Sequence, residues 1–378
     1  MINKVIILAA GNGKRMEESS PPAERETPKP LRKLLGMSII EWTVRRMKDL
    51  QLDVYVVIKP DDEGKFYEDL NKYDVHYIFE NQPLGTAHAL YSAKNVIFDD
   101  LFLVVMGDDI SNLSKDNLVD SPAIFVQETR DISAFGSVVV GKDSFVINIK
   151  EKEDRGEGLA NTGIYIMPKF FFDTFPGVRA RENGEYYLTD ALIAMVKQGV
   201  SIKALPIGYW KPINNHKDLL EAERELSIFN YTEICIRPAK EKDFHDLTKL
   251  LAELSTTNEK DLSKSFDPKE SFRKVLSNRN EFILVSSFSG RVVSSVTLII
   301  QDNISHGGRP YCHIENVVTD HEYRKKGIAL LNLRFAITFA KILSCYKAIL
   351  NCRPELMDFY TKAGFQINGE IEMRMDLD

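Results

Sequence analysis

The sequence is poor in cysteine: the chain of 378 residues has only four, all beyond residue 234. No two of them form a Cys-x-x-Cys pair, which argues against a zinc site or a disulfide framework and favours reduced, buried thiols. The sequence also lacks an apolar run long enough to span a bilayer, and its N-terminal apolar run is too short for a signal peptide. We therefore expect a cytoplasmic protein with no membrane partner.

Positive charge is not in excess either, because 49 Lys and Arg stand against 55 Asp and Glu, giving a net charge of −6. Proteins that coat nucleic acid carry an extended basic surface. We therefore expect no nucleic-acid partner, and local basic clusters must bind any phosphate. Internal repeats and low-complexity tracts are absent. With 44% hydrophobic residues, a chain of this length can bury more than one core, so two domains are expected.

The most informative stretch lies within the first thirty residues. The apolar run at residues 5–10 predicts a buried parallel strand, and Gly-Asn-Gly-Lys-Arg follows at residues 11–15. Glycines at the end of such a strand let the backbone approach a ligand, while Lys14, Arg15 and Lys29 can balance negative charge. A Gly-x-Gly is often only a tight turn, and its spacing here fits neither the dinucleotide nor the P-loop pattern. Together with the basic residues, it indicates a triphosphate site.

Helical and strand patterns then alternate up to the strand expected at residues 101–106, which predicts an α/β fold with a doubly wound, mostly parallel, Rossmann-like sheet. Ligands of such sheets gather at strand ends. Residues 80–87 follow one strand and open a helix, so their N–H groups and the Thr86 hydroxyl could hold a base or phosphate; an ordinary helix cap explains this segment alone equally well. Asp108 follows another strand, where a carboxylate either ends the strand or binds Mg²⁺.

The pattern Leu-Ala-Ala-Gly-x-Gly-x-Arg at residues 8–15, followed by Pro-Lys-Pro at 28–30, resembles the signature of the sugar-1-phosphate nucleotidyltransferases, or NDP-sugar pyrophosphorylases. The resemblance implies a GT-A-like domain in residues 1–230 that transfers a nucleotidyl group from an NTP to a sugar 1-phosphate, with Mg²⁺ as cofactor. Arg15, Lys29 and Asp108 would be catalytic. The nucleotide-binding residues would be Ala10, Gly11, Gly13, Lys14, Glu80, Gly85 and Thr86.

Two further motifs resemble the sugar side of that family. Residues 159–165 match its Asn-Thr-Gly-Ile strand, and residues 185–190 match its Tyr-Leu-Thr-Asp helix start. Recognition of hydroxyl groups needs fixed carboxylates and amides. The resemblance implies that sugar hydroxyls are bound by Gly136, Glu151, Asn161 and Thr189, and the sugar phosphate by Lys152.

The sequence departs from this family at two positions that bear on the ligands. Many relatives have an acidic residue where Pro212 stands, so we place the second Mg²⁺ ligand at Asn214, whose amide oxygen is suitable. Glu80 stands where many uridylyl- and thymidylyltransferases have glutamine. A carboxylate offers no donor, so it suits the N1–H and N2–H₂ donors of guanine better than the mixed edge of uracil. Guanine is therefore our hypothesis for the base.

Beyond residue 230 the pattern restarts. A strand at residues 313–320 leads through the basic, glycine-containing loop 323–329 into an apolar helix expected at 330–343, whose first N–H groups could hold a pyrophosphate. Arg-x-x-Gly-x-Ala in this loop resembles the acetyl-CoA loop of the GNAT N-acetyltransferases. More narrowly, the motifs at 313–318, 345–347 and 359–360 resemble glucosamine-6-phosphate N-acetyltransferase. The resemblance implies an α+β domain in residues 231–378, whose acetyl-CoA contacts would be Val317, Val318, Arg324, Lys325, Gly327, Ile328 and Ala329.

The same resemblance implies acetyl transfer to an amine, with an amino-sugar phosphate as the acceptor. Tyr360 stands where that family has a tyrosine that protonates the leaving thiolate, although a core aromatic is the commoner role of such a residue taken alone. Glu315 is a candidate base or sugar contact. Asn316 replaces an aspartate and Leu356 an asparagine of the family, which motivates an alternative: a non-catalytic, CoA-sensing or oligomerising module. Assembly into a homo-oligomer stays open.

Overall fold

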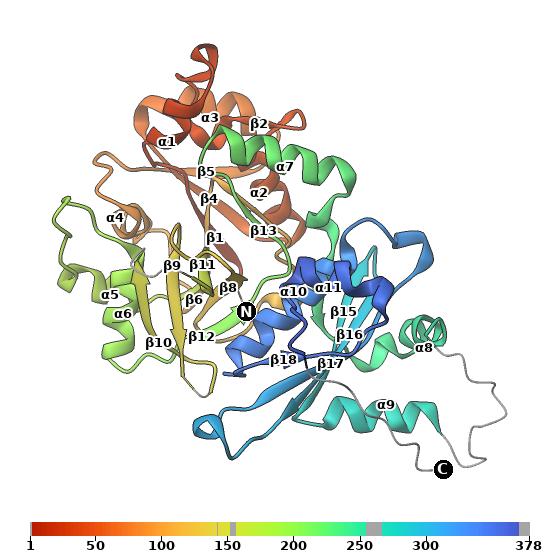
Figure 1. Cartoon of the computed structure of the whole chain (residues 1–378). Coiled ribbons are helices and arrows are strands. Elements are labelled where there is room, and N and C mark those ends of the chain that lie inside the picture. Colours follow the sequence, from red (N-terminus) through yellow and green to blue (C-terminus); the bar gives the residue numbers. More distant parts are fainter. Residues whose placement is uncertain (1, 142, 152–155, 255–266, 370–378) are drawn as a thin grey trace. The chain divides into compact units, whose positions relative to one another are not determined.

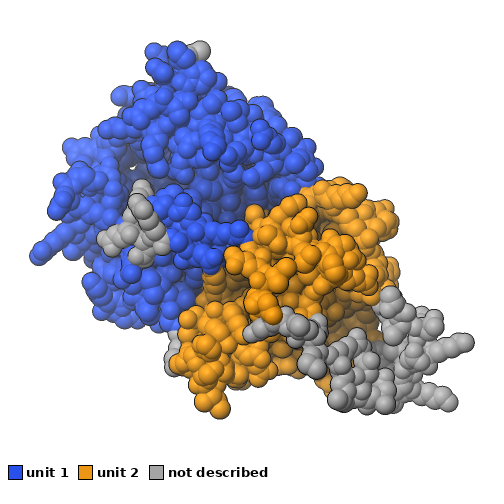
Figure 2. Space-filling view, in the orientation of Figure 1, with its two compact units in different colours: residues 1–235 blue, residues 236–378 orange. Residues whose placement is uncertain are grey.

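The computed structural model describes residues 2–141, 143–151, 156–254 and 267–369. The chain forms two compact units, Met1–Cys235 and Ile236–Asp378, coloured blue and orange in Figure 2. The boundary expected after residue 230 lies just before the 3₁₀ turn Tyr231–Glu233 that precedes this division. Lys152, the expected contact to the sugar phosphate, lies outside the described residues. Within the described ranges, no helix combines the length and the apolar character needed to cross a membrane.

The first unit is built on a sheet in which nine strands are described (Figure 1). At its centre, β1 (Lys4–Leu8) lies between β4 (Asp53–Ile58) and β6 (Leu101–Met106), and β5 (Val75–Phe79) follows β4, all of them parallel. The middle residues of β1 and β6 are fully buried, as expected for parallel strands covered on both faces. The α/β class predicted from the alternating pattern is confirmed.

Helices connect these strands. The first long one, α2 (Ile39–Asp49), begins after Ser38, whose side-chain oxygen accepts a hydrogen bond from the Glu41 N–H at 3.1 Å. Its apolar stripe, which includes Val44 and Met47, is fully buried. The other α-helices described in this unit are α1 (Lys14–Ser19), α3 (Glu63–Leu70), α4 (Thr86–Tyr91), α5 (Phe171–Thr174), α6 (Leu188–Lys197) and α7 (His216–Ile228).

The rest of this sheet is mostly antiparallel and is organised by β11 (Gly158–Pro168). This strand pairs with β8 (Ala123–Thr129) on one side, and on the other side with β6 from Tyr165 onward and with β9 (Gly136–Val140) at Ala160, so the sheet is mixed rather than parallel throughout. A register shift in β11 between Asn161 and Tyr165 falls on the Asn-Thr-Gly-Ile motif. The sheet also contains β10 (Val146–Glu151), antiparallel to β9, and β12 (Lys203–Pro206), parallel to β8. Separate strand pairs are formed by β2 (Lys33–Leu34) with β3 (Met37–Ser38) and by β7 (Asp109–Ser111) with β13 (Trp210–Pro212).

The second unit has a sheet of five described strands in the order β14-β15-β16-β17-β18. The central strands are antiparallel, whereas β18 is parallel to β17 and pairs with it only at Cys312 and His313. Helix α10 begins at Ile328, two residues before the predicted start, because Gly327 forms its N-cap. The elements are β14 (Cys235–Pro238), α8 (Phe244–Ala252), α9 (Pro268–Ser277), β15 (Glu281–Phe288), β16 (Arg291–Gln301), β17 (Tyr311–Thr319), α10 (Ile328–Ile342), β18 (Ala348–Ile349) and α11 (Met357–Ala363).

Candidate functional site

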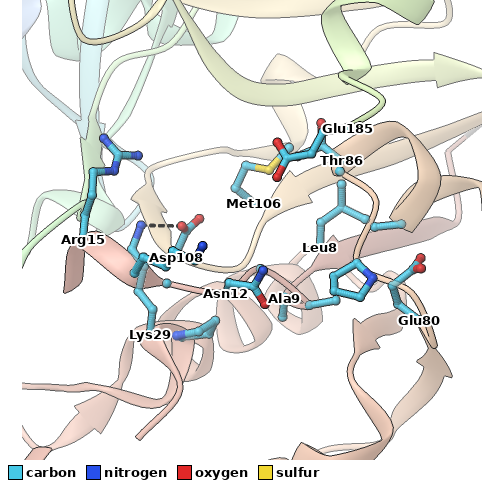
Figure 3. Close-up of a pocket in the computed structure, with 18 of the residues that line it drawn as sticks. Leu8, Ala9, Asn12, Arg15, Lys29, Glu80, Thr86, Met106, Asp108 and Glu185 are labelled. Carbon is cyan, nitrogen blue, oxygen red and sulfur yellow. Dashed lines mark hydrogen bonds and ion pairs between the residues drawn. The ribbon is translucent and has the colours of Figure 1, made fainter. Parts of the chain in front are cut away.

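A cavity of about 310 Å³ lies at the C-terminal ends of β1 and β6. Parallel strands of an α/β sheet present their ligands at this edge. Figure 3 shows Arg15, Lys29 and Asp108 on one side of the cavity and Glu80 on the other. The structure brings together in this wall the predicted residues Ala10, Gly11, Gly13, Lys14, Arg15, Lys29, Glu80, Gly85, Thr86, Asp108 and Asn214.

Glycines allow the close packing at this edge. Gly13 has a φ of +61°, and a Cβ there would lie 3.1 Å from the Cβ of Lys29. Gly107 donates its N–H to the Leu8 carbonyl at 2.9 Å, and a Cβ on Gly107 would lie only 3.1 Å from that carbonyl oxygen. The absence of a side chain therefore lets the end of β6 approach the end of β1, which aims Asp108 at the basic residues.

Basic side chains and oxygen ligands meet in pairs on the cavity wall. The Lys29 ammonium donates to Asp108 Oδ2 at 2.5 Å, and Arg15 Nη2 donates to Asn214 Oδ1 at 3.2 Å. The Lys29 side chain is only 9% exposed, so its charge is only weakly screened by water. Each candidate metal ligand, Asp108 and Asn214, therefore lies beside a positively charged side chain that can bind a phosphate group.

The neighbouring carboxylate, Asp109, has a different environment. Its Oδ2 accepts a hydrogen bond from Trp210 Nε1 at 2.9 Å, and the residue is not part of the cavity wall. Burial, and then the charge of Asp108, raises the pKa of Asp109 to about 7. Of the two adjacent aspartates, Asp108 is thus the one that faces the cavity.

Glu80 is buried and its carboxylate has several internal partners. Oε1 accepts hydrogen bonds from His88 Nδ1 at 2.8 Å and from the Gln82 N–H at 3.3 Å, and Oε2 accepts one from the Ser92 hydroxyl at 2.9 Å. A carboxylate has about four lone-pair positions. Three of them are used here, so the carboxylate retains capacity for about one further donor.

Gly85 and Thr86 belong to the cavity wall, together with Glu185 and Tyr187. Gly85 has a φ of +102°, and a Cβ there would lie 2.6 Å from the Tyr186 carbonyl oxygen, so this position requires glycine. The Thr86 hydroxyl oxygen accepts a hydrogen bond from the Leu188 N–H at 3.0 Å. This hydroxyl, expected to contact the ligand, therefore also supports the start of α6.

The predicted sugar-binding residues that the structure describes lie outside the cavity wall; they are Gly136, Glu151, Asn161 and Thr189. Gly136 is paired with Glu151 across β9 and β10, and a Cβ on Gly136 would lie 3.1 Å from Glu151 Oε1 and 3.6 Å from the Asn161 Cβ. These three residues are thus brought together. Thr189, in the first turn of α6, is 4% exposed, and its hydroxyl has no hydrogen-bond partner among the described residues.

In the second unit, the expected acetyl-CoA site begins at an irregularity in β17. The pairing with β16 shifts from Thr297–Glu315 to Ser295–Val318, which leaves Asn316 and Val317 opposite a single residue. Asn316 has a φ of +51°. Such a bulge bends the strand and interrupts its ladder. Because the described pairing with β18 ends at His313, the backbone around Val317 and Val318 has no described strand neighbour on that side.

The basic loop that follows β17 is held by its own side chains. Arg324 Nε donates to the Thr319 carbonyl at 2.9 Å, and Arg324 Nη2 donates to Glu253. Lys325 is exposed with a φ of +60°, and Gly327, with a φ of +81°, is the N-cap of α10. The structure therefore places Ile328 and Ala329 in the first turn of a long helix, where N–H groups lack intrahelical acceptors.

Tyr360, on α11, is 8% exposed and packs edge-on against Phe359 with ring centres 4.9 Å apart. Burial, followed by the nearby Cys352 and Glu315, raises the pKa of Tyr360, so its hydroxyl keeps its proton at neutral pH. Glu315 lies 3.2 Å from His313 Nε2. The structure thus brings the acid candidate near Glu315, the candidate base or sugar contact.

Comparison with protein families agrees with the division of the chain into two units. A model of the nucleotidyl transferase family matches residues 4–227, more than half of the chain. The chain belongs to this family. Residues 245–365 match a model of the acetyltransferase (GNAT) family. Both family resemblances identified in the sequence are thereby confirmed, and the two units are called below the nucleotidyl transferase unit and the acetyltransferase unit.

The nucleotidyl transferase unit has curated relatives. A Methanococcus maripaludis protein named bifunctional protein GlmU is 34% identical over 227 residues, which cover 58% of this chain and 54% of the relative. The low-salt glycan biosynthesis nucleotidyltransferase Agl11 of Haloferax volcanii is 28% identical over 236 residues, covering 58% of this chain and 65% of that protein. The chain thus spans about half the length of the GlmU relatives that it matches.

A solved structure supports the fold of the same unit. The Bacillus anthracis protein provisionally named glucose-1-phosphate thymidylyltransferase, in complex with a sucrose, aligns with a TM-score of 0.51 at 23% identity. The alignment covers 60% of this chain and 96% of that one. At this identity the likeness concerns the fold.

Several residues of the nucleotidyl transferase cavity were not predicted as ligands from the sequence. Asn12, Glu185 and Tyr187 belong to its wall. All three lie inside sequence motifs from which other residues were chosen as ligands: Asn12 in the motif at 8–15, and Glu185 and Tyr187 in the motif at 185–190. Their position in these motifs was the signal that could have identified them. Arg181 donates its backbone N–H to the Glu185 carbonyl at 3.0 Å and lies 4.2 Å from the centre of the Tyr187 ring. Its guanidinium is bonded to both oxygens of Asp190 at 2.7 Å, and no pattern in the sequence marks it.

The donor set of the nucleotidyl transferase cavity fits Mg²⁺. Asp108 offers a carboxylate and Asn214 an amide oxygen, and both residues belong to the same wall. Mg²⁺ prefers such hard oxygen donors and is commonly completed by water and substrate phosphates. The two residues would hold the ion together with the phosphates of the substrate.

Proposed function

We propose that the nucleotidyl transferase unit transfers a nucleotidyl group from an NTP to the phosphate of a hexose or hexosamine 1-phosphate and releases pyrophosphate. The observation that carries this proposal is the cavity itself, in which Lys14, Arg15 and Lys29 converge with the oxygens of Asp108 and Asn214. The family match of residues 4–227 supports it.

In this reaction a phosphate oxygen of the sugar 1-phosphate attacks the α-phosphorus of the NTP, and the bond to pyrophosphate breaks in line. Such phosphoryl-group chemistry depends mainly on positioning and charge neutralisation by the protein. Arg15 and Lys29 would stabilise the triphosphate and the leaving pyrophosphate. Bound Mg²⁺, held by Asp108 and Asn214, would supply further charge neutralisation at the phosphate oxygens.

The proposal extends to the base. The Glu80 carboxylate, fixed by His88 and Ser92, can accept about one more hydrogen bond. Guanine presents N–H donors on the corresponding edge, whereas the uracil edge also presents acceptors that a carboxylate repels. GTP is therefore the expected nucleotide.

A substrate matrix tests these statements. GTP, UTP, dTTP and CTP are each combined with glucose-, glucosamine-, N-acetylglucosamine- and mannose-1-phosphate, and pyrophosphate release is measured. We expect turnover with GTP and a hexosamine 1-phosphate. Strong preference for UTP or dTTP would reject the guanine proposal alone, whereas no release with any pair would reject nucleotidyl transfer.

We propose that the acetyltransferase unit transfers the acetyl group of acetyl-CoA to the amine of an amino-sugar phosphate. The neutral amine attacks the thioester carbonyl carbon, the C–S bond breaks, and the leaving CoA thiolate takes a proton from Tyr360. The nitrogen loses one proton to water as the amide forms, and Tyr360 regains its proton from water. The buried, protonated hydroxyl of Tyr360 supports this role. Together the two activities would yield an NDP-linked N-acetylated hexosamine.

Release of free CoA thiol from acetyl-CoA, with glucosamine 6-phosphate or glucosamine 1-phosphate as acceptor, tests the second activity. Asn316 favours an alternative in which the unit does not catalyse acetyl transfer. This residue is exposed in the bulge and its amide donates to Thr297 Oγ1 at 3.4 Å, so it offers an amide where the resembled family has a carboxylate. Tight CoA binding without turnover on a panel of amines would support a CoA-sensing or oligomerising module instead.

A further inference from the structure

Thr86 lies in the wall of the nucleotide cavity, yet its hydroxyl oxygen is used within the protein. The backbone N–H of Leu188, the first residue of α6, donates to Thr86 Oγ1 at 3.0 Å. The first N–H groups of a helix have no acceptor in the helix, and a polar residue just before it usually provides one. Tyr187 stands at that position in α6 and makes no side-chain cap. Thr86 therefore caps α6 from 102 residues away in the sequence.

Two backbone hydrogen bonds hold the same segments together. The Tyr186 N–H donates to the Leu84 carbonyl at 2.7 Å, and the Ala87 N–H donates to the Tyr186 carbonyl at 2.9 Å. Between them, Gly85 lets the two backbones approach, since a Cβ there would lie 2.6 Å from the Tyr186 oxygen and 2.8 Å from its nitrogen. The loop that carries Thr86 and the start of α6 thus form one connected structure.

This connected structure contributes to the cavity wall and leads directly to Thr189, a predicted sugar contact. Glu185 and Tyr187 line the cavity beside Thr86, and Figure 3 shows Glu185 and Thr86 next to each other. One residue after Leu188, Thr189 has a buried hydroxyl without a partner among the described residues. A buried hydroxyl without a partner is costly, so its presence suits a ligand group that would pair with it. The placement of this sugar-side segment depends on the Thr86 oxygen.

We propose that Thr86 is a positioning residue for the sugar 1-phosphate: its hydroxyl oxygen fixes the first turn of α6 and thereby the residues that receive the sugar. The inference rests on the proposed nucleotidyl transfer. It assigns to Thr86 a larger effect on sugar 1-phosphate affinity than on nucleotide affinity, although the residue belongs to the nucleotide-side loop.

Thr86→Val and Thr86→Ser test this role. Valine keeps the shape but removes the acceptor, leaving the Leu188 N–H unpaired, and serine restores the acceptor. We expect Thr86→Val to raise the KM for glucosamine 1-phosphate about tenfold, as for loss of one buried hydrogen bond. The KM for the NTP should change by less than about twofold, and Thr86→Ser should recover most of the loss. A larger rise in the NTP value than in the sugar value would overturn the inference.

Thr174→Val provides a matched control in the same unit. Thr174 is 4% exposed, donates its hydroxyl to Gln198 Oε1 at 3.3 Å, and lies outside the cavity wall. Thr174→Val should leave both KM values unchanged, while it lowers the melting temperature of the protein about as much as Thr86→Val does. Equal shifts in the two valine variants would show that Thr86 has only a structural effect.

A binding measurement separates failure of this inference from failure of the proposed function. The full chain is titrated calorimetrically with glucosamine 1-phosphate in the presence of a non-hydrolysable GTP analogue and Mg²⁺. Absence of pyrophosphate release by the unaltered protein would count against nucleotidyl transfer. Equal sugar-phosphate affinity of the unaltered protein and Thr86→Val would overturn the role of Thr86, whether or not turnover occurs.

Discussion

The two units use different parts of the chain for their expected ligands. In the nucleotidyl transferase unit, side chains converge: Lys29 meets Asp108 at 2.5 Å, and Arg15 meets Asn214 at 3.2 Å. In the acetyltransferase unit, backbone geometry prevails, with a bulge in β17 and a left-handed Gly327 at the start of α10. Substitutions that change charge should therefore matter most in the first unit, and substitutions that change backbone conformation should matter more in the second.

The largest effect is expected for Asp108→Asn. This change removes the charge that faces Lys29 and weakens the oxygen ligand for Mg²⁺, so pyrophosphate release should fall about 10³-fold. Steady-state pyrophosphate release and, independently, Mn²⁺ binding followed by calorimetry measure the loss. Acetyl transfer by the same variant should be unaffected.

Asp99→Asn is the matched control for that variant. Asp99 pairs with Lys4 at 3.4 Å and lies outside the cavity wall, so the loss of its charge should change pyrophosphate release by less than about twofold. Normal turnover of Asp108→Asn, or equal losses in both variants, would contradict the assignment of Asp108 as a metal ligand.

A smaller loss is expected for Tyr360→Phe, which removes the proposed proton donor and keeps the packed ring. Acetyl transfer should fall about 10²-fold, with pyrophosphate release unchanged. Because the pKa of Tyr360 is raised, the protonated form persists through neutral pH, and activity of the unaltered protein should decline only as pH rises through that raised value. The alkaline decline should be missing in Tyr360→Phe.

Tyr311→Phe controls for loss of a hydroxyl in the same unit. The Tyr311 ring, with the Lys347 ammonium 5.5 Å from its centre, is retained in the variant. Its acetyl-transfer rate should stay within about twofold of normal. If Tyr360→Phe were equally active, the acid role would be lost.

An intermediate effect is expected on the stability of the protein when glycine is replaced by alanine. Gly85→Ala places a Cβ against the Tyr186 backbone at a φ of +102°, which should cost about 1–3 kcal/mol in the free energy of unfolding. Gly64→Ala in α3 meets nothing within 4 Å and should instead stabilise by about 0.5–1 kcal/mol. Urea unfolding of the two variants measures both signs, and destabilisation by Gly64→Ala comparable to that by Gly85→Ala would contradict the close approach at Gly85.

The smallest effects compare two residues of the acetyl-CoA loop. Gly327→Val introduces a β-branched residue at a φ of +81°, so it should weaken acetyl-CoA binding about tenfold. Lys325→Gly removes an exposed charge but suits a φ of +60°, and it should weaken binding by no more than about threefold. Calorimetric titration with acetyl-CoA measures both. A greater loss in Lys325→Gly would show that side-chain charge, rather than backbone, dominates this loop.

Prediction from the sequence was most accurate where the pattern is local. The strand predicted at 101–106 coincides with β6. Continuous apolar runs bounded by polar or glycine residues suffice to define such elements. Helix α10 begins two residues before the start predicted at residue 330, because Gly327 provides its N-cap in a left-handed conformation.

The sequence by itself determined the two family resemblances, the strands that end at the cavity, and the residue types that converge there. Only the tertiary structure decided which atoms meet. It turned Asp108 toward Lys29 and Asp109 toward Trp210, gave Glu80 internal partners, and joined Thr86 to Leu188. The reason is that strand and helix patterns are set by neighbours in the chain, whereas hydrogen bonds between segments up to 102 residues apart depend on sheet order and register, which no local pattern contains.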